Sequence, residues 1–329
     1  MPHALPRLLL SLVVPLALAC GAGPAAAQPG AAFPQKPVRI IVPFPAGGTA
    51  DSIPRIVAEK LSARWGQAVI VDNRPGAGGN IGAEQAFHAD PDGYTLLASP
   101  PGPLAVNSNL YKKLNYDVSK FVPVTLLATM PNVLAVRPSL KVNSVKELIE
   151  LAKQQPNKVS FASQGNGTTS HLTASMLQLQ TGVALLHVPY KGTAPAMSDL
   201  IGGQVDMMFD NISSSLGQYK GGRIKLLAVA STQRAPSIPE VPTMQESGLP
   251  SFQSGTWVAV VAPPGTPVAI TNAIRDAMAE AVRMPDVKQR FADLGGEAVG
   301  DTSAQLATFL SEERARWADV IKRAHVSID

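Results

Sequence analysis

The chain has 329 residues, of which 45% are hydrophobic and 16% are charged, and its formal net charge is +4. No apolar stretch after residue 30 reaches the roughly 18 residues of a membrane span, so the sequence predicts a soluble globular protein with an ample core. The small positive surplus, carried by scattered lysines and arginines, argues against a nucleic-acid-binding protein and is compatible with small anionic ligands.

The N-terminus has the pattern of a secretory signal. Arg7 precedes an almost wholly apolar run, Leu8 to Ala19, and Ala25-Ala26-Ala27 comes just before Gln28. A charged start, an apolar stretch and an A-x-A cleavage site are typical of a signal peptide. We therefore expect a signal peptide over residues 1–27, with cleavage near Ala27-Gln28.

Two other interpretations of the N-terminus stay open. A buried N-terminal helix is disfavoured by Pro15, and Cys20 would mark a lipid-anchored form, although the residues before it match such sites poorly. Removal of residues 1–27 would leave 302 of the 329 residues, no cysteine and a net charge of +3. The mature chain would then have no disulfide and no thiolate metal site, and its length suggests two domains of about 150 residues.

The first third of the mature chain alternates strands with helices. We predict strands and helices, in chain order, at 38–42 (strand), 52–65 (helix), 68–71 (strand), 81–88 (helix) and 95–98 (strand). A glycine-rich turn over 76–80 precedes the second helix. This alternation implies parallel crossovers and a sheet covered on both faces.

The middle and the end of the chain repeat the pattern. A capping box at Ser144 opens a helix that Pro156 ends, and a final helix over 303–324 is expected to pack on the first domain. Apolar segments over 122–136 and 252–261 are the expected crossings between domains. The remaining predicted elements are 159–163 (strand), 168–180 (helix), 185–189 (strand), 193–202 (helix), 205–209, 226–230 and 257–262 (strands) and a helix capped by Thr266-Pro267.

Two loops share a chemistry suited to anion binding. Pro45-Ala46-Gly47-Gly48 lies between a strand and a helix start, and so does Gln164-Gly165-Asn166-Gly167. Glycine lets backbone N–H groups approach a ligand without a Cβ in the way, at a helix N-terminus that carries partial positive charge. We therefore predict that the two loops, one from each lobe, hold an anion together. A purely structural role as turns is the alternative.

Motifs of other functions are absent or incomplete. The sequence has no Walker loop, HExxH or G-x-S-x-G, and Ser170 stands where a dinucleotide fingerprint that begins at Gly165 needs its third glycine. The histidines of the mature chain lack metal-ligand spacing; they are His88, His171, His187 and His325. We expect no cofactor and no metal.

One pair of carboxylates leaves a catalytic alternative open. Asp206 and Asp210 flank Met207-Met208-Phe209, and alternate positions of a strand face the same way. Asp210, with Asn211 beside it, is suited to binding an amine, a hydroxyl or water. Ordinary solvation at a strand end is the alternative.

Several motifs together resemble one family. They are KPVRIIVPFPAGGTAD, VDNRPGAGGNIGAE, PDGYTLL, SQGNGTTSHL, VPYKGTAPAMSDLIGGQVDMMFD and PSIPEVPTMQESG. In this order and spacing they resemble the tripartite tricarboxylate transporter substrate-binding proteins, also called the Bug receptor family. The resemblance covers the mature chain from about Pro34.

The resemblance implies an α/β, two-lobed type II periplasmic-binding-protein fold. Each lobe would be a mostly parallel sheet flanked by helices, with the ligand cleft between the lobes. Together with the expected crossings, this gives a first lobe of residues 28–131 and 253–329 and a second lobe of residues 132–252. We expect a monomer.

Carried onto this sequence, the family's ligand-binding loops give two sets of residues. The first set is Phe44, Pro45, Ala46, Gly47, Gly48 and Asp51, and the second set is Ser163, Gly167, Thr168, Thr169 and His171. Tyr190, Lys191 and Asp210 would line the far end of the cleft, where ligand identity is decided. In the family a carboxylate is often met by the backbone amides and hydroxyls of these loops, and Gln164 and Asn166 are expected to carry little weight.

The function implied is that of a periplasmic receptor and not of an enzyme. It would capture a small carboxylate, either a di- or tricarboxylate or an aromatic carboxylate, and deliver it to the membrane permease subunits of a tripartite tricarboxylate transporter. Two alternatives stay open. The receptor could instead signal to a membrane sensor protein, or the chain could be a secreted hydrolase or lyase that works through Asp206, Asp210 or His171.

Overall fold

The computed structural model describes residues 1, 3 and 33–328, so the expected cleavage site and Cys20 lie outside the described residues, with most of the predicted signal peptide. A π-helical turn, η2 (Gly102–Val106), follows the third strand. The helices and longer strands, in chain order, are β1 (Val38–Val42), α1 (Thr49–Trp65), β2 (Val69–Asn73), α2 (Asn80–Phe87), β3 (Thr95–Ser99), β4 (Val122–Val136), α3 (Val145–Gln154), β5 (Ser160–Ser163), α4 (Thr169–Thr181), β6 (Leu186–Pro189), α5 (Thr193–Gly202), β7 (Met207–Asn211), α6 (Ile212–Lys220), β8 (Lys225–Val229), β9 (Gly255–Ala262), α7 (Val268–Arg283), α8 (Pro285–Asp293), β10 (Glu297–Ala298) and α9 (Ser303–Arg323).

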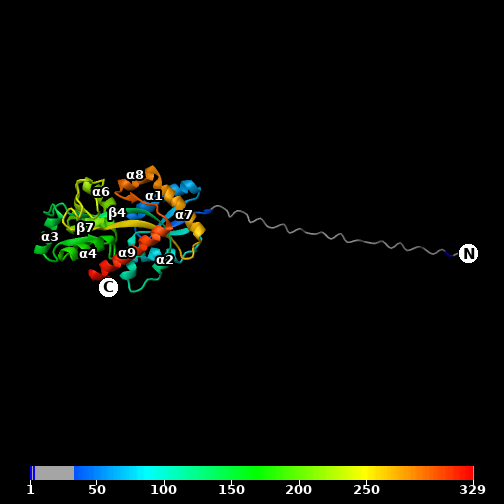
Figure 1. The fold of residues 1–329 in the computed structure, drawn as a ribbon, viewed down its shortest axis with the longest axis horizontal. Coiled ribbons are helices and arrows are strands. Elements are labelled where there is room, and N and C mark those ends of the chain that lie inside the picture. The colour runs from blue at the N-terminus through cyan, green and yellow to red at the C-terminus, as the bar shows by residue number, and fades with distance from the viewer. Residues whose placement is uncertain (2, 4–32, 329) are drawn as a thin grey trace. The chain divides into compact units, whose positions relative to one another are not determined.

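The strands form two groups that share β4. In the first group β2, β1 and β3 are parallel neighbours, and β9 and then β4 extend the sheet by antiparallel pairing. In the second group β6, β5 and β7 are parallel, and β4 pairs antiparallel with β7 and β8. In Figure 1 the second group lies with α3 and α4 at one end, and α1, α2 and α7 lie at the other.

The division of β4 between the two groups supports the expected lobes. Residues 122–131 pair with β9, whereas residues 132–136 pair with β7 and β8. The return crossing lies beside it, because the amide of Asn132 donates to the carbonyl of Ser254, and the amide of Ser254 donates to the carbonyl of Ala230. We propose lobe boundaries at 131/132 and 252/253 on this basis.

Most predicted elements are present, with shifted ends. Helix α1 begins at Thr49, three residues earlier than predicted, directly after Gly48 as N-cap. Strand β7 begins and ends two residues later than predicted, because its pairing with β4 runs to Asn211. Helices α6 and α8 and strand β10 were not predicted. Three serines and a glycine make α6 a weak helix by propensity, and burial of Ile212 and Leu216 stabilises it.

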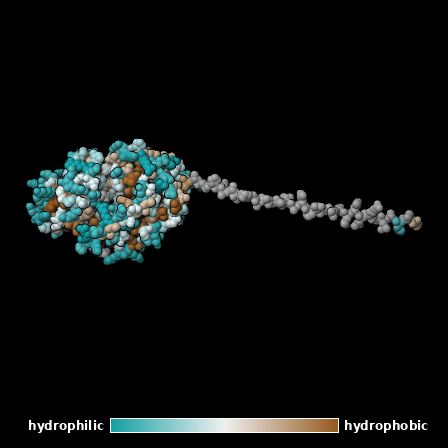
Figure 2. Space-filling model, in the orientation of Figure 1, coloured by the Kyte–Doolittle hydropathy of each residue, from teal (hydrophilic) through white to brown (hydrophobic). Residues whose placement is uncertain are grey.

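Apolar side chains fill both faces of each sheet. The mostly buried strands β1, β4 and β9 carry mostly Val, Ile, Leu and Ala, which suits strands covered on both sides. On the face shown in Figure 2, hydrophobic residues form separate small patches among hydrophilic ones. The apolar content of the sequence is therefore used mainly in the core.

Helix α9 is fastened to the sheet by a buried carboxylate. Glu313 is 7% exposed, and its Oε2 accepts hydrogen bonds from the indole nitrogens of Trp257, at 2.8 Å, and Trp317, at 2.9 Å. The helix packs on β4 and η2, as predicted for the first lobe. It also contacts α4, since Leu172 lies in the same apolar cluster as Leu306. Figure 1 shows α9 running across the molecule and ending near α4.

A stack of three rings supports the loop after β5. His171 and His187 lie 4.0 Å apart between ring centroids, and Phe161 stacks on His187 at 4.6 Å. The amide of Gly167 donates to Nδ1 of His171 at 3.2 Å, and Ser163 Oγ lies 2.7 Å from Nε2 of His187. Burial lowers the pKa of His171 to about 3, helped by the neighbouring His187, and burial lowers the pKa of His187 to about 4.

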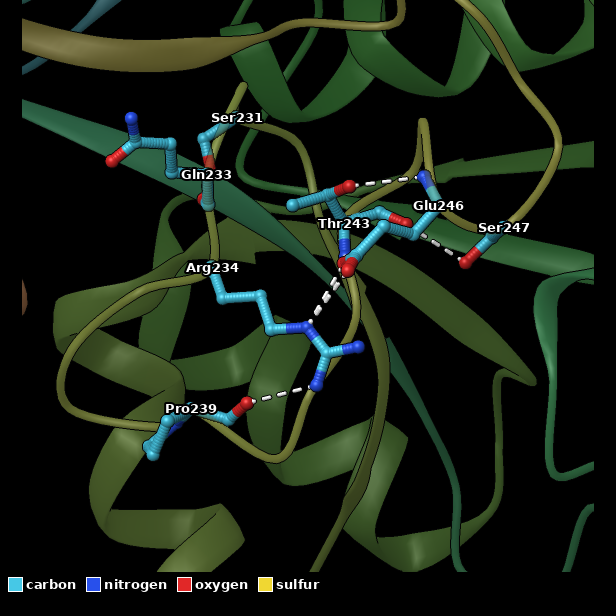
Figure 3. Close-up of polar contacts among 7 residues, drawn as sticks. All are labelled: Ser231, Gln233, Arg234, Pro239, Thr243, Glu246 and Ser247. Carbon is cyan, nitrogen blue, oxygen red and sulfur yellow. Dashed lines mark hydrogen bonds and ion pairs between the residues drawn. The ribbon is translucent and has the colours of Figure 1, made fainter.

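The loop between β8 and β9 is held by hydrogen bonds among its own residues (Figure 3). Arg234 binds the carboxylate of Glu246 through Nε and the carbonyl of Pro239 through Nη1. Glu246 and Thr243 bond each other's backbone amides with their side chains. The motif PSIPEVPTMQESG therefore has a structural explanation, because it shapes this loop.

The histidine stack predicts a loss of stability in acid. Both histidines are held neutral in the folded protein but titrate near pH 6.5 when unfolded, so stability present above pH 6.5 is lost as the pH falls towards 4. Each histidine contributes up to about 1.4 kcal/mol of lost folding stability per pH unit in this window. When the Tm is measured from pH 7 to 4.5, it should fall less in His187→Phe than in the wild type, whereas the exposed control His325→Gln should show the wild-type fall. Equal declines in His187→Phe and wild type would contradict this.

The indole–carboxylate cluster predicts a second stability effect. Glu313→Leu should lower the free energy of unfolding by about 2–5 kcal/mol, because two buried indole N–H groups lose their acceptor. Glu313→Gln should cost clearly less, since its amide oxygen still accepts. Denaturant unfolding measures both values, and equal losses would show that the indole bonds are not what stabilises α9.

Candidate functional site

A cavity of about 640 Å³ lies where the carboxyl ends of five strands meet. Its walls are the residues that follow β1, β3, β5, β6 and β7, which come from both proposed lobes. In α/β sheets ligands bind outside the carboxyl ends of parallel strands, because loops converge there and helices begin there. The lining segments are 44–50, 100–102, 166–169, 191–195 and 213–214, with single residues near them in sequence and with Gly78 and Thr256 from other parts of the first lobe.

The first predicted loop lies on the cavity wall. The five residues from Phe44 to Gly48 all line the cavity, and so do Thr49 and Ala50. Gly48 is the N-cap of α1 and provides no side-chain hydrogen bond to the first turn. Within the described residues, the amides of Gly48, Thr49 and Ala50 donate to no protein acceptor. This helix start therefore offers open N–H groups and a partial positive charge.

Asp51, predicted to bind ligand, lies behind the first loop and not on the cavity wall. Its carboxylate accepts from the amide of Gly47 at 3.0 Å, from Asn73 at 2.9 Å and from Arg55 at 2.9 Å. Burial alone would raise the pKa of Asp51, but the hydrogen bonds from Arg55, Gly47 and Asn73 lower it below its usual value. Asp51 therefore shapes the loop as a carboxylate.

The second predicted loop differs from the first. Gly167, Thr168 and Thr169 line the cavity, whereas Ser163 and His171 lie beneath the loop, in contact with the ring stack. The amides of Gly167 and Thr168 are already used by His171 and by the carbonyl of Gly165. The expectation that both loops present free glycine amides was therefore wrong for the second loop, where the amide and hydroxyl of Thr169 are the open groups.

The three residues predicted at the far end have different positions. Lys191 lines the cavity. Tyr190 does not, and its hydroxyl donates to Asp199 at 2.6 Å. Asp210 is 0% exposed and lies beneath the wall, where it accepts hydrogen bonds from Gln164, Ser214 and Ser215 at 2.6–2.8 Å. Burial raises the pKa of Asp210, although these donors oppose the shift.

The two lobes meet across the cavity. Thr49, from the first lobe, forms a hydrogen bond with Ser213 and accepts one at 3.4 Å from Asn211, both from the second. A Cβ placed on Gly48 would lie 3.9 Å from Thr193 Oγ1. The loops after β1, β6 and β7 therefore enclose the same space.

Charge on the cavity wall has one sign. Lys191 and Arg223 line the cavity, and of the described lining residues none is acidic. The described residues also include no group of three or more His, Cys, Asp or Glu that could hold a metal ion. No helix in the described part of the chain is sufficiently long and apolar to span a membrane.

Asp206 and Asp210, the carboxylates of the catalytic alternative, do not form a pair at the cavity. Asp206 binds Arg137 at 2.8 Å and accepts from the amide and hydroxyl of Ser160. Asp210 lies four residues further along the strand, a rise of about 13 Å. Neither lines the cavity, so the two carboxylates do not face one substrate there.

Sequence reasoning missed several cavity residues. Gln164 and Asn166, given little weight, line the cavity, and so do Pro101 and Thr193. Their position could have indicated this, because each follows a strand of a parallel group at its carboxyl end, as the two predicted loops do. A search for glycine alone does not find these residues, because they are not glycines.

Comparison with known proteins identifies the family of the chain. A family model described as tripartite tricarboxylate transporter family receptor matches residues 53–326. Protein BugT of Bordetella pertussis (strain Tohama I) is 38% identical over 318 residues, which cover 96% of this chain and 97% of BugT.

Solved structures match over nearly the whole described region. Rpa4515 of R. palustris, solved with adipate, is 35% identical with a TM-score of 0.87, covering 90% of this chain and 100% of that one. The periplasmic binding protein BugD is 37% identical with a TM-score of 0.84, covering 90% and 100%. These neighbours confirm the predicted two-lobed periplasmic-binding-protein fold. The chain belongs to the tripartite tricarboxylate transporter receptor family, the Bug family of solute-binding proteins.

Proposed function

We propose that this protein is a periplasmic receptor that captures a small carboxylate and delivers it to the permease subunits of a tripartite tricarboxylate-type transporter. The observation that carries the proposal is the uncapped start of α1, whose open amides line a cavity with two cations and, among the described residues, no acid. The signal-peptide pattern of the sequence supports a periplasmic location. We propose a monomer that binds no metal, cofactor or nucleic acid.

The available interactions are sufficient for useful affinity. A hydrogen bond to a charged group contributes about 1.5–3 kcal/mol, and a helix N-terminus about 1 kcal/mol more. Four or five such contacts give roughly the 8 kcal/mol of a micromolar ligand after the cost of association. The adipate of Rpa4515 shows that a relative with this fold holds a carboxylate. Ligand binding without an arginine clamp is therefore reasonable for this chain.

Two other functions, a signalling receptor and a secreted enzyme, have less support. A receptor that signals to a membrane sensor protein would bind the same ligand, and the identity of the partner distinguishes it. A hydrolase or lyase needs a general base within hydrogen-bond reach of substrate. Asp206 and Asp210 both lie off the cavity wall and are engaged elsewhere, and so is His171.

A ligand screen tests the proposal. The unfolded and refolded protein, freed of retained solute, should gain about 2.7 kcal/mol of stability at a hundredfold excess of a carboxylate ligand over its Kd, seen as a rise in Tm. Mass spectrometry of solutes released by denaturing the purified protein should identify a carboxylate. Absence of any shift across di-, tri- and aromatic carboxylates at millimolar concentration would refute carboxylate capture, and turnover of the bound acid would favour the enzyme.

Gly48 tests the location of the site. Its backbone tolerates a side chain, at φ −91°, so Gly48→Val should fold and place methyl groups in the cavity towards Thr193. Carboxylate affinity should fall by about a hundredfold or more, because the open amides are covered and lose charge-assisted hydrogen bonds. Calorimetric titration measures the effect.

Two matched variants make the result interpretable. Gly48→Ala should weaken binding less than Gly48→Val, since its Cβ makes only ordinary contact with Thr193 at 3.9 Å. Gly217→Val introduces the same side chain on α6, where a Cβ has no neighbour within 4 Å, and should retain wild-type affinity. Unchanged affinity in Gly48→Val would move the site away from α1.

A further inference from the structure

The two segments that cross between the lobes meet at a weak point of the sheet. Pro131 of β4 pairs with Gly255 of β9. Proline has no N–H group, and a Cβ on Gly255 would collide with the carbonyl of Met130, so the two strands approach closely there. Directly after this pair, β4 leaves β9 and pairs with β7 and β8. We therefore expect the sheet to bend between the lobes at this pair.

A buried polar cluster, which we call the hinge cluster, lies beside this point. It consists of Asn132 on β4, Ser254 on the return crossing and Thr173 on α4. Asn132 and Thr173 are 0% exposed and Ser254 is 4% exposed. The Nδ2 of Asn132 donates to Thr173 Oγ1 at 2.9 Å and to Ser254 Oγ at 3.4 Å, and the two hydroxyls form a hydrogen bond with each other. The hinge cluster therefore joins both crossings to a helix of the second lobe.

The direction of its hydrogen bonds connects the hinge cluster with the cavity. Thr173 Oγ1 donates to the carbonyl of Thr169 at 2.6 Å. Because a hydroxyl has only one proton, Ser254 is then the donor in its bond to Thr173. Thr169 is the first residue of α4 and lines the cavity, where its amide is open. A chain of hydrogen bonds therefore runs from the return crossing to the cavity wall, and bonds in such a chain strengthen one another.

Asn132 has an opposing effect on the same arrangement. Its Oδ1 is buried, and no described group donates to it. The lobes are in contact here, through the bond of Thr49 with Ser213, and we call this the closed arrangement. An unpaired buried acceptor is costly, and a bend of the sheet that exposes Asn132 to water removes the cost. The two hydroxyls of the hinge cluster therefore favour the closed arrangement, whereas the oxygen of Asn132 disfavours it.

We propose that Thr173 and Ser254 are positioning residues of the solute site. Their hydroxyls tie the start of α4 to the return crossing and stabilise the closed arrangement. Asn132 limits this stabilisation, so that the empty receptor opens and admits solute. The inference rests on the proposed function, because it takes the cavity to be a solute site. Its direct consequence, the ratio of closed to open molecules in the empty protein, is measurable without any ligand.

The distance between the lobes in refolded, ligand-free protein tests the proposal. Beyond the predicted signal peptide the chain has no cysteine, so spin labels attach only at Lys153→Cys on α3 and Lys288→Cys on α8, both exposed positions. Double electron–electron resonance then gives the ratio of closed to open molecules. Thr173→Val and Ser254→Ala should each lower this ratio by about fivefold, the effect of one hydrogen bond. Asn132→Leu should raise it, because the unpaired acceptor is lost while the chain of hydroxyls stays intact.

Two matched variants separate positioning from a general effect on stability. Thr173→Ser retains the hydroxyl and should restore the wild-type ratio. Thr181→Val removes the same kind of bond from the same helix, since Thr181 Oγ1 donates to the carbonyl of Leu177 at 2.6 Å, but it lies at the far end of α4. Its ratio should equal that of the wild type even where its Tm falls. The Tm of every variant is measured alongside, so that an unfolded variant is recognised.

The outcomes distinguish this inference from the proposed function. If Thr173→Val and Ser254→Ala keep the wild-type distances, or if Thr181→Val changes them equally, the two hydroxyls do not position the lobes. If Asn132→Leu lowers the ratio as Ser254→Ala does, the opposing role of Asn132 is wrong. Failure of carboxylate capture would differ: neither adipate nor malate, the acids of two solved relatives, would shorten the distance in wild-type protein, while the ligand-free differences between variants would persist.

Discussion

The site depends on the start of α1, whose first backbone amides have no acceptor among the described residues. A helix leaves its first N–H groups unpaired, and most helices satisfy them with a capping side chain. Helix α1 has Gly48 at that position, so the amides are open to the cavity. Leaving them open costs stability in the free protein, and an anion bound there recovers it. A buried strand, a short loop and an uncapped helix, in this order, therefore form the first wall of the proposed site.

Each cavity loop is held from behind by a buried polar group. Asp51 holds the loop after β1, the histidine stack holds the loop after β5, and Asp210 holds the start of α6 and Gln164. These groups form hydrogen bonds to their loops, and such bonds restrict the conformations that the loops can adopt. Preorganisation of this kind lowers the entropy cost of binding. Asp51, His171 and Asp210, which the resemblance placed among the ligand contacts, therefore hold the cavity loops from behind.

The lobes are joined by two strands and covered by one helix. Strand β4 belongs to both groups of strands, and the chain returns beside it at Ser254. Helix α9 packs on the first lobe and reaches α4 in the second, with Glu313 and two tryptophans fixing its register. Contacts of Thr49 with Asn211 and Ser213 join the lobes at the cavity itself. The site is therefore enclosed by loops of both lobes.

The sequence by itself determined the alternation of strands and helices and the location of the first loop. β-branched runs, glycine and proline act locally, so β1 and the loop to Gly48 were predictable. Only the tertiary structure decided which side chains face the cavity. Asp51, His171 and Asp210 are polar and adjacent to the loops, yet burial and partners from distant segments turn them away. Hydrogen-bond pairing between residues such as Gln164 and Asp210, 46 positions apart, is not encoded in local spacing, so these contacts behind the cavity wall could not be predicted from the sequence.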